Sequence, residues 1–341
     1  ELITLEKLNP LKVYGSWPPF STCFRIDFSI PLTIQVERKK RQEKLRNDGS
    51  INAVSLSKHA LLKLQQQTNF LSDKKSNVKD NYSLDDLEND NLNLLNMGHY
   101  MCRYQWQGNF SSPINEKLIS GIRVLDIGCA TGSWILDMAA QYPTSTFLGL
   151  DKLDLFPPSD QRFPNTGFIQ ANVLDGIPFP DNTFDFVCER FLAFTALTGW
   201  QFTYLLDEMI RVCKSDGWIE IMEYRGYENA GPIAQTGLSQ ILRSEGINSE
   251  STVDPIPQTM KNHHSLVDFK HFEKRGPIGA WGGQFGSLML KYYKSIGKSI
   301  YLKLRDEDPD YDEFIASVEK EFDRYKTTIG NFRCFARKRA H

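Results

Sequence analysis

The sequence contains the run Ile122-Arg-Val-Leu-Asp-Ile-Gly-Cys-Ala-Thr-Gly-Ser-Trp-Ile135. An apolar strand is expected to lead into Asp126 and then into a tight turn that carries Gly128 and Gly132, with an amphipathic helix directly after it. A strand, a glycine turn and a helix N-terminus bring backbone N–H groups close to a ligand. The turn lacks the G-x-G-x-x-G spacing of dinucleotide sites and the Gly-Lys-Ser/Thr of phosphate loops. The acid at its mouth favours a cationic or hydroxyl-bearing ligand over a pyrophosphate.

The next three predicted strands each end in a polar side chain, namely Asp151, Asn172 and Glu189. A carboxylate at the place of Asp151 can accept both hydroxyls of a ribose. The amide of Asn172 and the backbone N–H of Val173 are suited to an adenine edge. Because parallel strands meet at one carboxyl edge, these groups predict a nucleoside pocket there. The strands are expected at residues 145–150, 167–171 and 183–188.

Four ordered segments resemble the motifs of class I S-adenosylmethionine-dependent methyltransferases. They are Val124-Leu-Asp-Ile-Gly-Cys-Ala-Thr-Gly132, Gly149-Leu-Asp151, residues 172–187 and residues 206–220. Two flanking segments, residues 99–113 and 276–283, make the chain most similar to the fungal LaeA-like methyltransferases. The resemblance covers roughly residues 90–341 and is more specific for the fold and the cofactor than for the substrate.

The resemblance implies an α/β, Rossmann-like class I methyltransferase fold. Such a fold has a mostly parallel seven-stranded sheet with an antiparallel C-terminal hairpin, and helices on both faces. The resemblance also implies S-adenosyl-L-methionine as the cofactor and no metal. Ala130 departs from the family's G-x-G-x-G turn; its methyl group disfavours positive φ, so weaker or reshaped cofactor binding is expected. The implied cofactor-binding residues are Asp126, which lies near the methionine amino group by analogy, and Gly128, Cys129, Ala130, Gly132, Asp151, Lys152, Asn172, Val173 and Glu189.

The sequence does not assign a catalytic residue. Methyl transfer from a sulfonium mainly requires alignment and exclusion of water, and a base only where the acceptor must lose a proton. Glu189, Glu223 and Tyr224 are candidates because they follow the fourth and fifth strands, although an ion pair with Arg190 explains Glu189 equally well. Two functions stay open: a methyltransferase acting on a small-molecule or protein acceptor, and a catalytically weak or silent relative that binds partners and regulates.

The amino-acid composition restricts the classes of binding partner that are expected. The net charge of −2 provides no general attraction to nucleic acid or to an anionic membrane. No apolar run reaches the length of a membrane span. The six cysteines are scattered without a C-x-x-C pair, which predicts a reducing compartment, cytoplasm or nucleus, and no zinc site. The expected partners are an unidentified methyl acceptor and, as an open alternative, another protein, whereas nucleic acid and membrane are disfavoured.

The first 91 residues differ in character from the rest. We interpret residues 1–91 as a poorly structured N-terminal extension with a polar linker at 72–91, and residues 92–341 as the methyltransferase domain. The extension carries the basic cluster Arg38-Lys-Lys-Arg41, for which a solvated helix face or linker is favoured over a nuclear-localisation or nucleic-acid patch. Because the chain begins at Glu1 rather than at methionine, a fragment or a processed product is expected.

Overall fold

A computed structural model of the protein describes residues 13–14, 94–193, 197, 199–236, 253–304 and 311–340. Apart from Val13 and Tyr14, the predicted extension of residues 1–91 lies outside the described residues, including its basic cluster and its linker. In these described ranges, no helix is long and apolar enough to cross a membrane.

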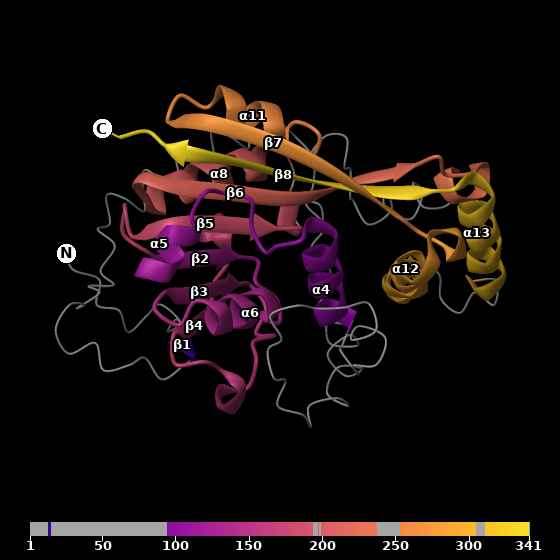
Figure 1. The fold of residues 1–341 in the computed structure, drawn as a ribbon, viewed down its shortest axis with the longest axis horizontal. Coiled ribbons are helices and arrows are strands. Elements are labelled where there is room, and N and C mark those ends of the chain that lie inside the picture. Colours follow the sequence, from indigo (N-terminus) through magenta and orange to yellow (C-terminus); the bar gives the residue numbers. More distant parts are fainter. Residues whose placement is uncertain are drawn as a thin grey trace.

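The fold is organised around one eight-stranded sheet with the order β1-β4-β3-β2-β5-β6-β8-β7 (Figure 1). The five consecutive strands β4, β3, β2, β5 and β6 are parallel to one another. Strand β8 is antiparallel to β6 and β7, and β1 is antiparallel to β4. The predicted seven-stranded sheet with its antiparallel C-terminal pair is confirmed, and β1 adds a short edge strand. The strands are β1 Val13–Tyr14, β2 Arg123–Ile127, β3 Thr146–Asp151, β4 Thr166–Gln170, β5 Phe184–Arg190, β6 Cys213–Glu228, β7 Leu266–Pro277 and β8 Thr328–Lys338.

The central strands are buried on both faces because their apolar residues run almost without interruption. Alternate residues belong to different core clusters: Leu125 and Val187 pack on one side of the sheet, and Val124 and Phe186 on the other. All four side chains are fully buried. The run of apolar residues that identified these strands in the sequence therefore supplies both halves of the core.

Helices cover both faces, as predicted. Helices α8 (Gly199–Val212) and α11 (Ile256–Asn262) contribute to the cluster on one face, and α5 (Asn115–Ser120) and α6 (Ser133–Gln141) to the cluster on the other. From the sequence, residues 201–213 are predicted to form a helix with one apolar face, and the apolar side of α8 does face the sheet at helical spacing. Its buried residues include Phe202, Leu205, Leu206, Met209 and Val212.

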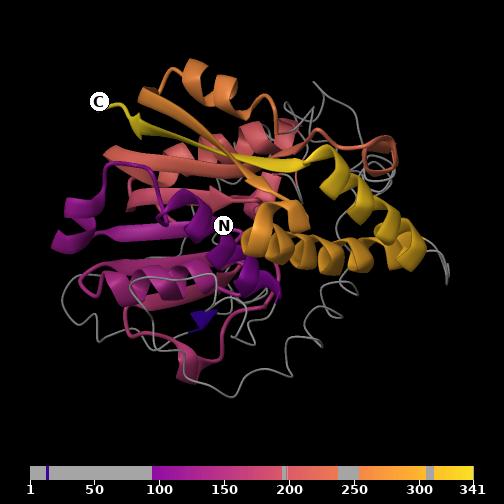
Figure 2. The same ribbon diagram turned by 45° about the vertical axis from the view of Figure 1, so that its right-hand side comes forward.

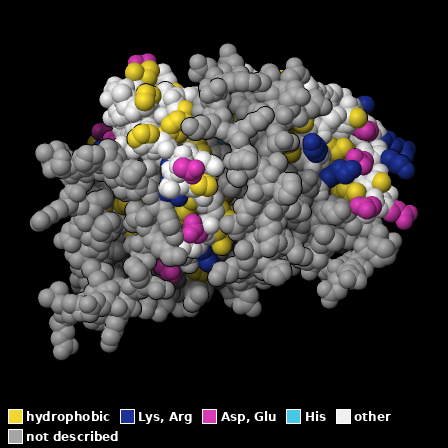
Figure 3. All heavy atoms as spheres, turned by 90° about the horizontal axis from the view of Figure 1, so that it is seen from below, with side chains coloured by type: hydrophobic (Ala, Val, Ile, Leu, Met, Phe, Trp, Pro, Cys, Tyr) yellow, Lys and Arg dark blue, Asp and Glu magenta, His cyan; other side chains and the backbone are white. Residues whose placement is uncertain are grey.

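A third core cluster joins α4 (Leu94–Trp106), α12 (Gly283–Leu304) and α13 (Tyr311–Tyr325) beside the sheet (Figures 1 and 2). Gly98 permits the close approach, since a Cβ at that position would lie 2.6 Å from the hydroxyl oxygen of Tyr292. An ion pair of 2.9 Å between Lys294 and Glu319 joins α12 to α13. Charged side chains of both signs are intermixed at this end of the molecule (Figure 3). These helices therefore pack on α4 and present a solvated outer surface.

Strand β6 is longer than the sequence indicates. A turn at residues 214–217 and a strand at 218–222 are predicted, but β6 starts at Cys213, directly after α8. Its pairing with β5 is irregular between Cys213 and Trp218, where Asp216 has a φ of 61°. Beyond Met222 the strand continues because it pairs with β8 as far as Glu228. Backbone pairing, not the apolar pattern, sets both ends of this strand.

Candidate cofactor site

The glycine turn after β2 has a left-handed backbone at three positions. The φ angles of Gly128, Ala130 and Gly132 are 73°, 47° and 73°. The N–H of Gly128 donates to the carbonyl of Leu150 at 2.8 Å, which fixes the turn against β3. A Cβ at Gly132 would lie 2.6 Å from the ring of Phe168, so glycine is required there for space as well as for conformation. Ala130 adopts the strained conformation that its place in the turn predicts.

Asp151 locks the turn to the end of β3. Its Oδ2 accepts a hydrogen bond of 2.8 Å from the N–H of Ala130, and its Oδ1 accepts one of 2.9 Å from the N–H of Leu153. Burial raises the pKa of Asp151, and these backbone hydrogen bonds lower it in part. Each carboxylate oxygen retains a second lone pair, which suits it to a diol. The N–H of Ala130 therefore already has a hydrogen-bond acceptor within the protein.

Asp126 is the buried acid at the end of β2. Its side chain is 3% exposed, and its Oδ1 accepts a weak hydrogen bond of 3.6 Å from the Sγ of Cys188. Burial raises its pKa to about 7, although the nearby charge of Arg190 lowers it. A carboxyl held so far from water is stabilised in its charged form by a cationic partner.

The predicted adenine side is formed by the residues after β4. The Oδ1 of Asn172 accepts a hydrogen bond of 3.2 Å from the N–H of Leu174 and so caps a short 3₁₀-helix, η4 (Val173–Asp175). Val173 is buried, whereas Lys152 is exposed at the rim beside Asp151. Asn172 thus has a structural role in the loop, and Oδ1 retains a lone pair toward the carboxyl edge.

Glu189 and Glu223 form a buried carboxyl pair across β5 and β6. Both are fully buried, and each accepts a hydrogen bond from the loop after β5: Glu189 from the N–H of Leu192 at 2.5 Å, and Glu223 from the N–H of Ala193 at 2.6 Å. Burial raises the pKa of Glu189, and a hydrogen bond to Glu223 lowers it in part. The two carboxyls therefore favour a shared proton over two adjacent charges.

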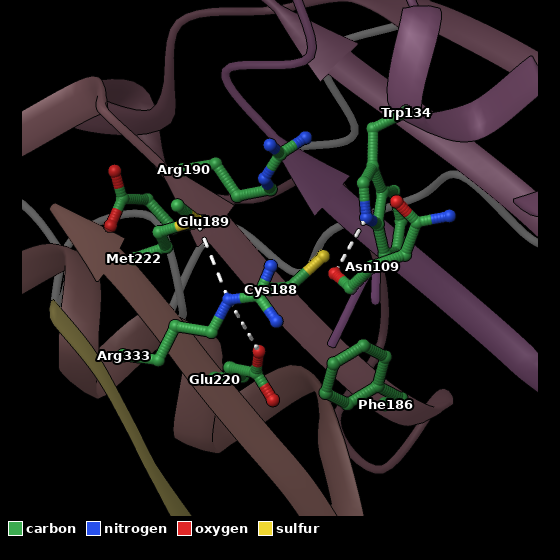
Figure 4. A pocket seen from close by; sticks show the side chains of 9 residues that line it. All are labelled: Asn109, Trp134, Phe186, Cys188, Glu189, Arg190, Glu220, Met222 and Arg333. Carbon is green, nitrogen blue, oxygen red and sulfur yellow. Dashed lines mark hydrogen bonds and ion pairs between the residues drawn. The ribbon is translucent and has the colours of Figure 1, made fainter. Parts of the chain in front are cut away.

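The alternative ion pair between Glu189 and Arg190 is not formed. The carboxylate of Glu189 and the guanidinium of Arg190 point in opposite directions (Figure 4), because successive residues of a strand face opposite sides of the sheet. The third candidate, Tyr224, stacks on Phe191 with ring centroids 4.3 Å apart. Burial raises the pKa of Tyr224 well above its ordinary value, so it remains a neutral phenol near pH 7.

Helix α4 closes over the glycine turn; from the sequence, Tyr104 and Trp106 of this helix were considered as a cover for the cofactor, but Asn96 and His99 were not. Its Asn96 accepts hydrogen bonds from the hydroxyls of Thr131, at 3.3 Å, and Ser133. One turn further along α4, His99 is 3.1 Å from the Oδ2 of Asp137 on α6. In the sequence, this contact is indicated only by Asp137, a charged residue among the apolar residues of α6.

A small cavity of about 10 Å³, the space of a single water molecule, lies beside Glu189 and Arg190 at the end of β5 (Figure 4). On its floor Arg333 stacks on Trp106 at 4.6 Å and approaches Glu220 to 3.8 Å. Trp106 also donates a hydrogen bond of 2.6 Å to Asn331, so this tryptophan packs the sheet. The cavity is lined by Asn109, Trp134, Phe186, Cys188, Glu189, Arg190, Glu220, Met222 and Arg333.

The fold is of the Rossmann-like class, with polar side chains at the carboxyl edge of its parallel strands. In the described ranges, no group of three or more His, Cys, Asp or Glu is arranged to hold a metal ion.

Comparison with known proteins gives the family more closely. Residues 124–217 match a methyltransferase domain family. The N-methyltransferase tcpN of Claviceps purpurea is 31% identical over 142 residues, which is 40% of this chain and 48% of that protein. The demethylmenaquinone methyltransferase of Anoxybacillus flavithermus is 30% identical over 124 residues, 35% of this chain and 50% of that protein. The chain spans about half the length of the curated relatives it matches.

A solved structure with a similar fold is the phosphoethanolamine N-methyltransferase 2 of Haemonchus contortus in complex with S-adenosyl-L-methionine. It is 16% identical, covers 77% of this chain and 61% of its own, and has a TM-score of 0.44. The sheet order is that of the predicted Rossmann-like class I fold, and the match to the methyltransferase domain family lies within it. The domain match agrees with the fold class predicted from the sequence. The structure of the Haemonchus protein holds S-adenosyl-L-methionine, which for this chain is the cofactor expected from the sequence.

Proposed function

We propose that this chain transfers a methyl group from S-adenosylmethionine to a small-molecule or protein acceptor. The observation that carries the proposal is the left-handed turn at Gly128–Gly132, fixed to Asp151 and flanked by the buried Asp126. When bound, S-adenosylmethionine supplies an electrophilic methyl group on a sulfonium. The residues present fit it: we assign Asp151 to the ribose, Asn172 and Val173 to the adenine, and Asp126 to the amino group.

The protein's own contribution is alignment and protection from water. Asn96, hydrogen-bonded to Thr131 and Ser133, holds α4 over the glycine turn and covers the methionine end of the site. The Glu189–Glu223 pair joins the end of β5 to the middle of β6, and burial raises the pKa of Glu189, which favours its protonated form. Tyr224 does not act as the base, because burial raises its pKa and so keeps the phenol protonated near pH 7. We therefore assign proton transfer, where the acceptor requires it, to the carboxyl pair.

The acceptor and the setting are also part of the proposal. The name of the demethylmenaquinone methyltransferase relative favours a small molecule. The two flanking segments at residues 99–113 and 276–283 support the finer likeness to the LaeA-like methyltransferases. We place the protein in the cytoplasm or nucleus because the cysteines of the described residues are all free and buried.

The second candidate function, a silent regulatory relative, is favoured by Ala130 in the turn. A transfer assay with labelled S-adenosylmethionine against cell extract separates the two functions, with Asp151→Ala as the control. The proposal predicts label in a discrete fraction with the intact protein and none with the variant. The absence of label with both proteins would favour the silent relative.

A further inference from the structure

Arg190 ends β5 beside the glycine turn, and its charge lacks a close counter-ion. Ile127 pairs with Glu189, so Gly128 and Arg190 are the next residues on two neighbouring parallel strands. No carboxylate in the described part of the chain lies within 4.0 Å of its guanidinium. Its Nε is buried and makes no hydrogen bond with the described residues. Arg190 is half-buried, and a guanidinium that is partly removed from water favours an anionic partner.

His99 holds the guanidinium in position without neutralising it. The Nδ1 of His99 is 3.2 Å from NH1 of Arg190, and its Nε2 is 3.1 Å from the Oδ2 of Asp137. Burial lowers the pKa of His99 to about 4, so the imidazole is neutral. With the proton on Nε2, which donates to Asp137, Nδ1 accepts from the arginine. An imidazole in place of a carboxylate leaves the full positive charge of Arg190 available.

The groups around Arg190 are complementary to an amino acid. Asp126, on the neighbouring strand β2, is close enough for Arg190 to lower its pKa. The carboxylate of Asp126 and the guanidinium of Arg190, on adjacent strand ends, match an α-ammonium and an α-carboxylate. The carboxylates of Glu189 and Glu223 are held by hydrogen bonds from the loop after β5, and Glu189 points away from the guanidinium, although the charge of Arg190 still lowers the pKa of Glu189. The only carboxylate in the proposed cofactor is at its methionine end.

We propose that Arg190, held in place by His99, binds the methionine carboxylate of the cofactor, with Asp126 binding the adjacent ammonium. This inference rests on the proposed function, because it requires S-adenosylmethionine in the pocket. Arg190 is a binding residue and His99 a positioning residue. A carboxylate of the acceptor would offer the same chemistry, so the test must remove the cofactor's carboxylate alone.

Calorimetry with two ligands makes that separation. S-adenosylhomocysteine carries the carboxylate, and S-adenosyl-3-thiopropylamine keeps the ammonium but lacks the carboxylate. The intact protein is expected to bind the first roughly 10- to 100-fold more tightly, the range of one buried charge-assisted hydrogen-bond pair. In Arg190→Gln this ratio falls to within about twofold of unity. Arg190→Lys, which keeps the charge, retains an intermediate ratio.

The matched control is Arg103→Gln. Arg103 lies on α4, one turn from His99, but it is already paired with Asp137 at 2.8 Å, so its loss leaves the ratio between the two ligands unchanged. The ratio is informative even where a variant binds both ligands more weakly. A ratio near unity in the intact protein, or an unchanged ratio in Arg190→Gln, would overturn the assignment. Failure of the intact protein to bind S-adenosylhomocysteine would instead refute the proposed function itself.

Discussion

The substitution Asp126→Asn is expected to stabilise the fold at high pH while weakening cofactor binding. Asp126 is 3% exposed, and burial raises its pKa from an ordinary 3.8 to about 7. Between these two pH values the folded protein keeps a proton that the unfolded chain has released. The folded state is therefore progressively destabilised as the pH rises from about 4 to about 7. Asparagine has nearly the same shape and no charge, so it escapes this cost.

The magnitude follows from the pKa. A pKa of about 7 in place of 3.8 corresponds to roughly 4 kcal/mol of unfolding free energy between the acid and alkaline limits. Roughly 3 kcal/mol of it falls between pH 5 and pH 8. The stability advantage of Asp126→Asn over the intact protein should grow by this amount across that interval. Differences in packing between the two side chains cancel, because they do not depend on pH.

Urea unfolding of both proteins at pH 5 and pH 8 measures this difference directly. The same substitution should weaken binding of S-adenosylhomocysteine at pH 8, because an amide cannot pair with an ammonium. Stability and affinity would then change in opposite directions, as expected where a residue serves the ligand at the expense of the fold. An advantage that stays constant within about 0.5 kcal/mol between the two pH values would refute the reasoning.

Three further substitutions test neighbouring parts of the structure. Burial raises the pKa of Asp137, but hydrogen bonds from His99 and Asn109 and the charge of Arg103 outweigh burial, so the pKa lies below its ordinary value. The charged carboxylate therefore stabilises the fold at neutral pH, and this contribution is lost as the pH falls through the lowered pKa. Asp137→Asn should therefore cost about 2–4 kcal/mol in urea unfolding at pH 7 and less at a pH well below 3.8, and an equal cost at both would contradict this. Gly132→Ala, at a φ of 73° and against Phe168, should lower stability by about 2–4 kcal/mol. Its control, Gly226→Ala, has a φ of 87° but nothing within 4 Å of the added Cβ, and should cost about 1–2 kcal/mol; equal losses would show that space at Gly132 is not limiting. Ala130→Gly should change stability by no more than about 1 kcal/mol and leave affinity for S-adenosylhomocysteine undiminished in calorimetry, because the N–H that reaches Asp151 is kept; weaker binding would contradict this.

The sheet could be predicted from sequence because its signals are local. Stretches of five to seven residues that are mostly apolar identify β2 to β5, and a polar residue near the end of each stretch marks the carboxyl edge. Positive φ at Ala130 was likewise expected from its place in a glycine turn. The ends of β6 could not be predicted, because pairing with β8 extends this strand through polar residues up to Glu228.

The interactions around the site could not be predicted because they join residues far apart in the chain. His99 meets Arg190 across 91 positions and Asp137 across 38. The sequence interpretation considered Arg190 only as a partner of its neighbour Glu189. The alternation of side chains along β5 separates them: Glu189 turns toward Glu223, and Arg190 turns toward α4. Sequence thus located the cofactor edge but not the charges that α4 and β5 bring to it.

The most direct test of the central claim is calorimetric titration of the intact chain with S-adenosylmethionine, beside Asp151→Ala. The account predicts a Kd of about 1–100 μM for the intact chain, and at least a 100-fold loss in the variant, because one carboxylate serves both the ribose and the turn. Thermal unfolding of the variant without ligand shows whether it still folds. Absence of binding heat from the intact chain at millimolar S-adenosylmethionine would contradict the account.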